Sequence, residues 1–175
     1  MTSMNRVKIG IVSDSHRKIG LLEDAISVIK KEGCTHIIHA GDIVLKESLE
    51  LLKNSGLDYT AVLGNNDIAL IEYMDKYNLF KEPHYFKLGD LTFKLMHLPY
   101  FLSGDADVVI YGHTHYFKAE KKGKTLYLNP GEICARKKPL SEFAILETKG
   151  HSYIVKRFLK EPDGSRYECE EFSYE

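Results

Sequence analysis

The sequence predicts an α/β protein in which a parallel or mixed N-terminal half is followed by antiparallel C-terminal strands. Between residues 7 and 63, three short apolar runs rich in β-branched residues alternate with two amphipathic segments. This alternation is typical of a parallel sheet whose strands are joined by right-handed helical crossovers. In the last third of the chain, strand-like runs follow one another and are separated only by turn residues, which indicates antiparallel pairing.

The individual elements follow from hydrophobic periodicity. In the first half we expect strands at 7–12, 36–40 and 59–63 and helices at 21–31 and 46–53. Gly33 follows the first helix as a C-terminal cap would. In the second half we expect a helix at 68–77, strands at 85–88, 91–96 and 107–111, a hairpin at 117–128, and strands at 142–146, 153–158 and 167–172.

Length and composition predict one globular domain. The chain has 175 residues, and we expect a single domain over 1–175 whose motifs lie in 6–146 and whose C-terminal strands occupy 147–175. Hydrophobic residues make up 43% and charged residues 28%, which is ordinary for a protein with a sizeable core. The net charge of −1 gives no reason to expect a nucleic-acid or membrane partner.

The N-terminal stretch and the cysteines predict a cytoplasmic protein. Residues 1–6 lack the apolar core of a signal peptide, and no apolar run reaches the roughly 18 residues of a membrane span. Three cysteines, Cys34, Cys134 and Cys169, are odd in number and far apart. Free thiols in a reducing compartment explain this pattern better than a disulfide or a metal site.

Polar side chains that could bind metal ions follow five of the predicted strands. They are Asp14 and His16 after the first strand, Asp42 after the second, Asn65 after the third, His97 after the strand at 91–96, and His113 and His115 after the strand at 107–111. In open parallel sheets the ligand crevice lies beyond the carboxyl ends of the strands, so these groups should meet there. Two divalent cations would need about this many protein ligands, and Asp42, central in the order, is the expected bridge between them.

Five short motifs in order carry a family resemblance. They are Asp14-Ser15-His16, Gly41-Asp42, Gly64-Asn65-Asn66-Asp67, the lone His97, and Gly112-His113-Thr114-His115. Together they resemble the motifs of calcineurin-like metallophosphoesterases. The short chain and Asn129-Pro130-Gly131 resemble the small stand-alone phosphodiesterases of the YfcE type. The resemblance covers about 7–146 and implies a metallophosphoesterase-type β-sandwich flanked by helices.

The resemblance also implies a dinuclear metal centre. One ion would be held by Asp14, His16, Asp42 and His115, and the other by Asp42, Asn65, His97 and His113. A hydroxide that bridges the ions would attack phosphorus in line. Manganese is the first expectation for both ions, and nickel, zinc, iron or magnesium also suit nitrogen and oxygen ligands.

The same resemblance assigns further roles and partners. The predicted catalytic residues are Asp42, Asn66, Asp67 and His113, with a plain turn-forming role as the alternative for Asp67, and Asn66 is a predicted substrate contact. Arg136 is a second predicted substrate contact, not from the resemblance but because a guanidinium matches a phosphate group; a solvated basic turn with Lys137 and Lys138 is the alternative. The predicted substrate is a small phosphodiester. The predicted assembly is a homo-oligomer, either a dimer or a tetramer.

Three positions depart from the family pattern. Asn66 stands where relatives often have a histidine, and an asparagine cannot protonate a leaving group. We therefore expect either a preference for esters with good leaving groups or a substrate that carries its own acid. His97 is followed by Leu98-Pro99 rather than glycine, and the apolar stretch 98–102 is open to two interpretations, a core or subunit contact or a pocket wall. Glu132 replaces the serine that commonly follows Asn-Pro-Gly.

Two other functions are possible on the same fold. One is a scaffold with a weak or inactive site, as in a eukaryotic retromer subunit, and the presence of all seven ligand types argues against it. The other is a nuclease of the superfamily. Nucleases usually carry extra domains and basic clefts, for which 175 residues and a net charge of −1 leave little room.

Overall fold

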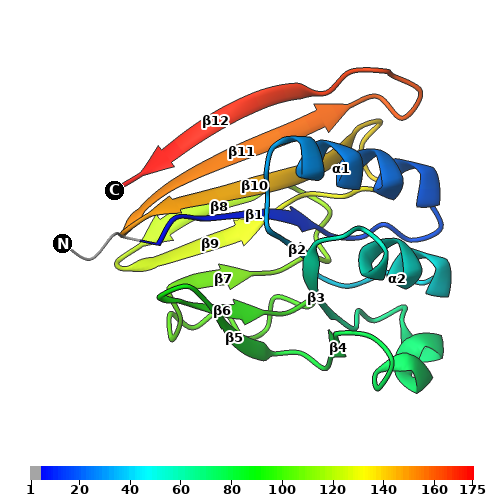
Figure 1. Ribbon diagram of the computed structural model, residues 1–175, viewed down its shortest axis with the longest axis horizontal. Coiled ribbons are helices and arrows are strands. Elements are labelled where there is room, and N and C mark those ends of the chain that lie inside the picture. Colours follow the sequence, from blue (N-terminus) through cyan, green and yellow to red (C-terminus); the bar gives the residue numbers. More distant parts are fainter. Residues whose placement is uncertain (1–4) are drawn as a thin grey trace.

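The computed structural model describes residues 5–175 and contains two stacked β-sheets with two helices on the outer face of the larger sheet (Figure 1). Residues 1–4, part of the stretch expected to lack a signal peptide, lie outside the described residues. The fold is the helix-flanked β-sandwich that the resemblance implies. Within residues 5–175, no helix is long and apolar enough to cross a membrane.

The larger sheet has seven strands in the order β12-β11-β10-β1-β2-β3-β4. Its strands are β1 (Val7–Val12), β2 (His36–His39), β3 (Asp58–Val62), β4 (Leu79–Phe80), β10 (Ser141–Lys149), β11 (Ser152–Lys160) and β12 (Glu168–Tyr174). Strands β1 to β4 are parallel to one another, and β10 pairs antiparallel with β1 and is followed by β11 and β12, each antiparallel to the strand before it. The predicted division into a parallel first half and antiparallel C-terminal strands is therefore confirmed for this sheet.

The smaller sheet has five strands in the order β5-β6-β7-β9-β8. Its strands are β5 (His84–Leu88), β6 (Leu91–Leu95), β7 (Val108–Ile110), β8 (Lys118–Lys122) and β9 (Thr125–Asn129). The central strands β6, β7 and β9 are parallel, while β5 and β8 pair antiparallel at the two edges. The carboxyl ends of β6 and β7 consequently lie at the same edge of this sheet.

Two apolar layers hold the sandwich together. One lies between the two sheets and joins residues such as Ile9 and Ile38 of the larger sheet to Phe93 and Ile110 of the smaller one. The other lies beneath the helices α1 (Ile19–Lys31) and α2 (Lys46–Lys53) on the outer face of β1 to β3. Because both faces of β1 to β3 are covered, these strands read as continuous apolar runs in the sequence.

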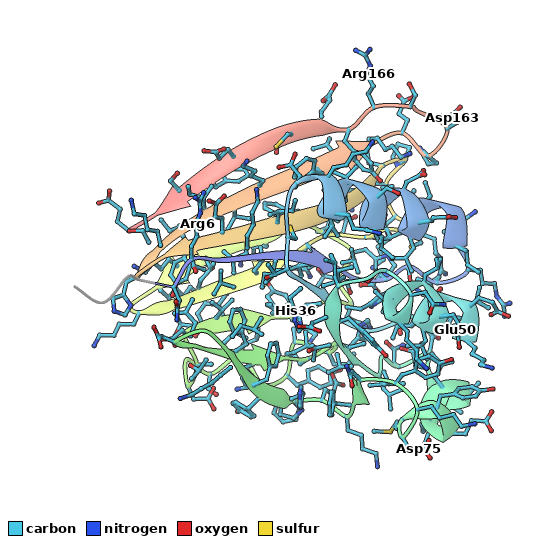
Figure 2. The ribbon with its side chains drawn as sticks, viewed as in Figure 1. Arg6, His36, Glu50, Asp75, Asp163 and Arg166 are labelled. Atoms are coloured by element: carbon cyan, nitrogen blue, oxygen red, sulfur yellow. The ribbon has the colours of Figure 1, made fainter. Side chains whose placement is uncertain are left out.

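The structure corrects the middle of the chain. The helix expected at 68–77 is a short 3₁₀-helix, η1 (Ile68–Tyr73), followed by turns, and the two-residue strand β4 has no clear pattern of its own in the sequence. The stretch 98–102 is not part of the core, because Tyr100 is 74% exposed and Phe101 45% exposed. The charged side chains of Asp163 and Arg166 point outward from the connection between β11 and β12 (Figure 2).

Candidate metal centre

The loops that leave five strands meet at one end of the sandwich. The larger sheet brings Asp14 and His16 after β1, Asp42 after β2 and Asn65 after β3. The smaller sheet brings His97 after β6 and His113 and His115 after β7. The structure thus brings together all seven predicted ligands, four from one sheet and three from the other.

Backbone hydrogen bonds tie these loops to one another. The Asp14 amide donates to the Gly41 carbonyl at 2.9 Å, and the His16 amide donates to the Asp42 carbonyl at 3.0 Å. In the smaller sheet, the Gly112 amide donates to the His97 carbonyl at 3.1 Å. The side chains therefore project from loops that are fixed by neighbouring main chain, as a preorganised site requires.

Five of the seven predicted ligands have a left-handed backbone. The φ angles are 53° at Asp14, 46° at His16, 57° at Asp42, 67° at His113 and 68° at His115. A non-glycine residue in this region costs about 1–3 kcal/mol, and such residues cluster where function requires a particular side-chain direction. The strained turns after β1, β2 and β7 therefore set the directions in which these five side chains point.

Glycine precedes Asn65 and His113 because the neighbouring ligands leave no room for a Cβ atom. A Cβ at Gly64 would lie 2.3 Å from Asp42 Oδ1, and one at Gly112 would lie 2.9 Å from Asp14 Oδ2. The close approach of a ligand carboxylate is the reason that the structure shows.

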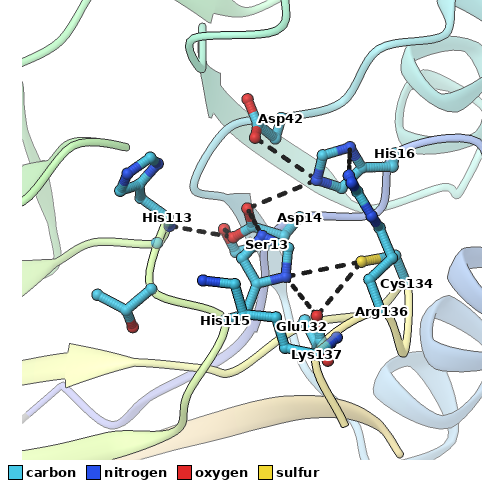
Figure 3. Close-up of polar contacts among 12 residues, drawn as sticks. Ser13, Asp14, His16, Asp42, His113, His115, Glu132, Cys134, Arg136 and Lys137 are labelled. Carbon is cyan, nitrogen blue, oxygen red and sulfur yellow. Dashed lines mark hydrogen bonds and ion pairs between the residues drawn. The ribbon is translucent and has the colours of Figure 1, made fainter. Parts of the chain in front are cut away.

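The Asp14 carboxylate has one satisfied oxygen and one free oxygen. Oδ2 accepts hydrogen bonds from Ser13 Oγ at 2.6 Å and from the His113 amide at 3.2 Å. Oδ1 is buried without a hydrogen-bond partner among the described residues, and so is His16 Nε2, which lies 3.9 Å from it (Figure 3). His115 Nε2 lies 3.1 Å from the same oxygen. Burial would raise the pKa of Asp14, but its interactions with His115 and His16 hold that pKa well below its usual range.

Asp42 lies between the two groups of ligands. Its Oδ2 atom is 3.5 Å from His16 Nε2 and 3.4 Å from His97 Nε2. Burial would raise the pKa of this carboxyl, but His97 and Asn66 lower it to about 2. An ionised carboxylate in this position can contact a cation on either side.

The second group of ligands converges on Asn65. Its Oδ1 atom is 2.9 Å from His97 Nε2 and 3.2 Å from His113 Nδ1. His97 is fully buried, and its Nδ1 lies 2.8 Å from the Ala40 carbonyl, so Nε2 is the nitrogen aimed at the centre. The residues Leu98 and Pro99 after His97 do not displace its ring from the site.

Asn66 and Asp67 have different positions although they are neighbours. Asn66 is exposed, and both its amide groups donate to the Asp42 carboxylate, the backbone at 3.0 Å and Nδ2 at 2.9 Å. Asp67 is buried behind the centre and accepts hydrogen bonds from the backbone amides of Gly64, Ile43 and Val44. Asp67 thereby joins the loop of Asp42 to the loop of Asn65.

The sequence interpretation missed the role of Glu132, which it identified only as a departure from serine. This side chain is fully buried and contacts His115 Nδ1 on the ring edge opposite to Asp14. Its other oxygen accepts the backbone amides of Lys137 and Lys138, each at 2.9 Å. Burial would raise the pKa of Glu132, but His115 and the Lys138 amide lower it to about 2. The sequence signal for this role was the position of Glu132, a charged residue directly before the apolar residues Ile133 and Cys134.

The arrangement fits divalent cations. The donors are carboxylate oxygens, an amide oxygen and imidazole nitrogens. In two groups of three, Asp14, His16 and His115 as well as Asp14, Asp42 and His97, the possible ligand atoms lie within 4.8 Å of one another. The unpartnered Asp14 Oδ1 and His16 Nε2 are buried polar atoms that a cation would satisfy. A cavity of about 290 Å³ over the centre is lined by both Asn66 and Arg136.

Comparisons with known proteins agree with this geometry. Residues 7–151 match the model of the calcineurin-like phosphoesterase superfamily domain. The phosphodiesterase MJ0936 of Methanocaldococcus jannaschii is 31% identical over 160 residues, which cover 84% of this chain and 96% of that protein. A solved archaeal phosphodiesterase superposes with a TM-score of 0.77 at 30% identity, over 88% of this chain and all of that one.

More distant structures share the fold alone. Vps29 of Cryptosporidium parvum superposes with a TM-score of 0.76 at 19% identity, over 97% of this chain and 99% of that one. The phosphoesterase YfcE of E. coli superposes with a TM-score of 0.68 at 20% identity, over 86% of this chain and 91% of that one. The convergent ligands, the matched domain and the phosphodiesterase relative lead to one conclusion: the chain belongs to the calcineurin-like phosphoesterase superfamily and is a hydrolase of phosphoric esters.

Proposed function

We propose that the protein is a phosphodiesterase of small substrates whose centre holds two divalent cations, with manganese the first candidate. The position of Asp42 Oδ2 carries the proposal, because this atom lies within 3.5 Å of His16 on one side and of His97 on the other. Asp14, His16 and His115 complete one set of ligands with Asp42, and Asn65, His97 and His113 complete the other. The cations, when bound, lower the pKa of a water molecule for in-line attack and neutralise charge on the phosphoryl oxygens.

The protein's own side chains have separate tasks in this proposal. Asn66 holds the shared carboxylate of Asp42 and faces the cavity over the centre. Arg136 lines the same cavity, and its guanidinium suits the oxygens of a bound phosphate. Asp67 positions the loops of Asp42 and Asn65 and has no contact with the substrate.

Removal and replacement of the metal ions test the proposal. Protein stripped with a chelator is expected to be inactive, and manganese, nickel, zinc or magnesium, each added alone, should restore activity to different extents. Metal analysis should find about two ions per chain, and bis(p-nitrophenyl) phosphate should be cleaved faster than p-nitrophenyl phosphate. A folded protein that neither binds metal nor cleaves either ester would contradict the proposal and favour the scaffold alternative, which the shared fold of Vps29 suggests.

Asn66→His tests the proposed preference for good leaving groups. A histidine could protonate the leaving oxygen, so kcat for esters of poor leaving groups is expected to rise about 10-fold or more. The measurement is kcat against leaving-group pKa for a series of aryl methyl phosphates, and the slope should become shallower in the variant. An unchanged slope, with metal content also unchanged, would remove Asn66 as the cause of the preference.

Glu132→Gln tests how His115 is oriented. A carboxylate behind a metal-binding histidine fixes the ring and raises its basicity, and loss of such a partner typically weakens metal binding about 10–100-fold. We expect that loss for one of the two ions, measured by calorimetric titration of the metal-free protein. Glu168→Gln, an exposed change at the start of β12, is the matched control. Two ions bound with wild-type affinity would exclude the positioning role.

The cytoplasmic location and the homo-oligomeric state remain predictions from the sequence. Light scattering of the purified protein measures the second of these directly.

A further inference from the structure

A second and larger cavity, of about 570 Å³, opens beside the metal centre. It shares the side chains of His16, Asn66 and Arg136 with the smaller cavity over the centre, so the two spaces adjoin. The smaller cavity accommodates the reacting phosphate in the proposed function. The larger cavity has the volume of a small-molecule site and lies where one substituent of a phosphodiester would extend.

The charge of the larger cavity is one-sided. Its lining includes Arg17, Lys18 and Arg136 and contains no carboxylate. None of these three cations forms an ion pair with an acidic side chain within residues 5–175, whereas Lys138 and Arg157 are both paired with Glu142. The chain as a whole has 24 basic and 25 acidic residues, so three unpaired cations around one cavity are a local departure from its balance.

The other lining residues of the larger cavity indicate what kind of chemical group would lie between the metal centre and the three cations. Val44 and the buried Cys134 add apolar surface to the lining of this cavity. Among residues 5–175, the one polar side-chain contact of Arg136 is from its Nη1 to His16 Nδ1 at 3.2 Å, which places the guanidinium beside a residue that lines both cavities. A compact, partly apolar linker such as a sugar would suit this space, with an anion at its far end.

We propose that the larger cavity is a subsite for a second phosphate group on the same substrate. The preferred substrate class is then a small phosphodiester in which one ester substituent carries a further phosphate monoester. Arginine and lysine side chains recognise such a group through charge-assisted hydrogen bonds, and unpaired cations gain most from it. This inference rests on the proposed function, because the first phosphate is assumed to lie at the metal centre.

A matched pair of esters tests the subsite. Thymidine 5′-(p-nitrophenyl phosphate) and its 3′-phosphorylated form share the leaving group and the sugar and differ only in the second phosphate. With the manganese-loaded enzyme, kcat/KM is expected to be at least about 10-fold higher for the phosphorylated ester. The double variant Arg17→Gln/Lys18→Gln should bring this ratio close to one. The control Lys30→Gln/Lys31→Gln, at the other end of α1, should keep the wild-type ratio.

The outcomes separate the subsite from the function. Equal kcat/KM for the two esters would overturn the subsite and leave the phosphodiesterase in place. If neither ester is cleaved, the proposed function fails, and binding measured by calorimetry then tests the subsite. Binding of thymidine 3′,5′-bisphosphate at least about 10-fold more tightly than thymidine 5′-phosphate would support the subsite, and equal binding would overturn it. Faster cleavage of a single-stranded oligonucleotide than of both esters would overturn the assignment to a small substrate.

Discussion

Replacing Asp42 by asparagine is expected to lower kcat/KM for bis(p-nitrophenyl) phosphate by at least about 10³-fold and to reduce bound metal from the two proposed ions to fewer than one. Loss of a partner behind a metal ligand already costs about 10–100-fold, and Asp42 is itself in contact with both groups of ligands. The asparagine keeps the shape of the side chain but removes the charge that faces both cations. Metal analysis and steady-state kinetics on the same sample measure the two effects together.

The control for this variant is Asp163→Asn. Asp163 is exposed in the connection between β11 and β12, and its loss should change neither metal content nor kinetics. Wild-type metal content in Asp42→Asn, with activity retained, would show that Asp42 is not the shared ligand. Thermal unfolding of the metal-free proteins should place Asp163→Asn at the wild-type melting temperature. Asp42→Asn should melt somewhat lower, because the new amide group cannot accept one of the two hydrogen bonds that Asn66 donates to Asp42.

Replacing Asp67 by asparagine is expected to lower the free energy of unfolding by about 1–3 kcal/mol, because a buried N–H group loses its acceptor. The carboxylate accepts from Gly64 and Val44, each at 2.7 Å, and from Ile43 at 3.1 Å. Burial raises the pKa of Asp67, so the loss of its negative charge costs little. The destabilisation arises because the side-chain NH₂ group of the new asparagine must face a backbone N–H, and neither group can accept a hydrogen bond. For a chain of this size the melting temperature should fall by about 3–10 °C.

The same variant should also bind metal more weakly, since Asp67 joins the loops of Asp42 and Asn65. Asp58→Asn, exposed at the beginning of β3, is the matched control and should leave both the melting temperature and the metal affinity unchanged. A melting temperature within about 1 °C of the wild type, in the metal-free protein, would show that the three hydrogen bonds do not stabilise the fold.

The regular parts of the fold could be predicted because local and tertiary signals agree. Helix α2 was predicted with the bounds that the structure has, and the strands β1 to β3 were predicted within one residue, since burial on both faces makes each of them a continuous apolar run. The region after β3 could not be predicted in detail. The helical spacing at 68–77 is realised only as the 3₁₀-helix η1, and two-residue β4 depends on pairing with β3.

For the candidate site, the sequence predicts which residues are ligands and that they follow the strands. Their convergence follows from the geometry of the sheets. The roles of Glu132 and Asp67 depend on contacts between loops that are far apart in the sequence. Glu132 reaches His115 across 17 residues, and Asp67 reaches the β2 loop across 24. Hydrophobic periodicity carries no information about contacts between distant loops. The sequence therefore shows that Glu132 departs from the family pattern but not which residue it contacts.

The division of the ligands between the two sheets links metal binding to folding. Four ligands stand on the larger sheet and three on the smaller one, so ions held between them act as a cross-link across the apolar layer of the sandwich. The unfolded chain has no such arrangement, so free metal at about 100 times its dissociation constant would add roughly 2.7 kcal/mol to the stability of the fold. A cell that is short of the metal would therefore contain less of the folded protein as well as less activity.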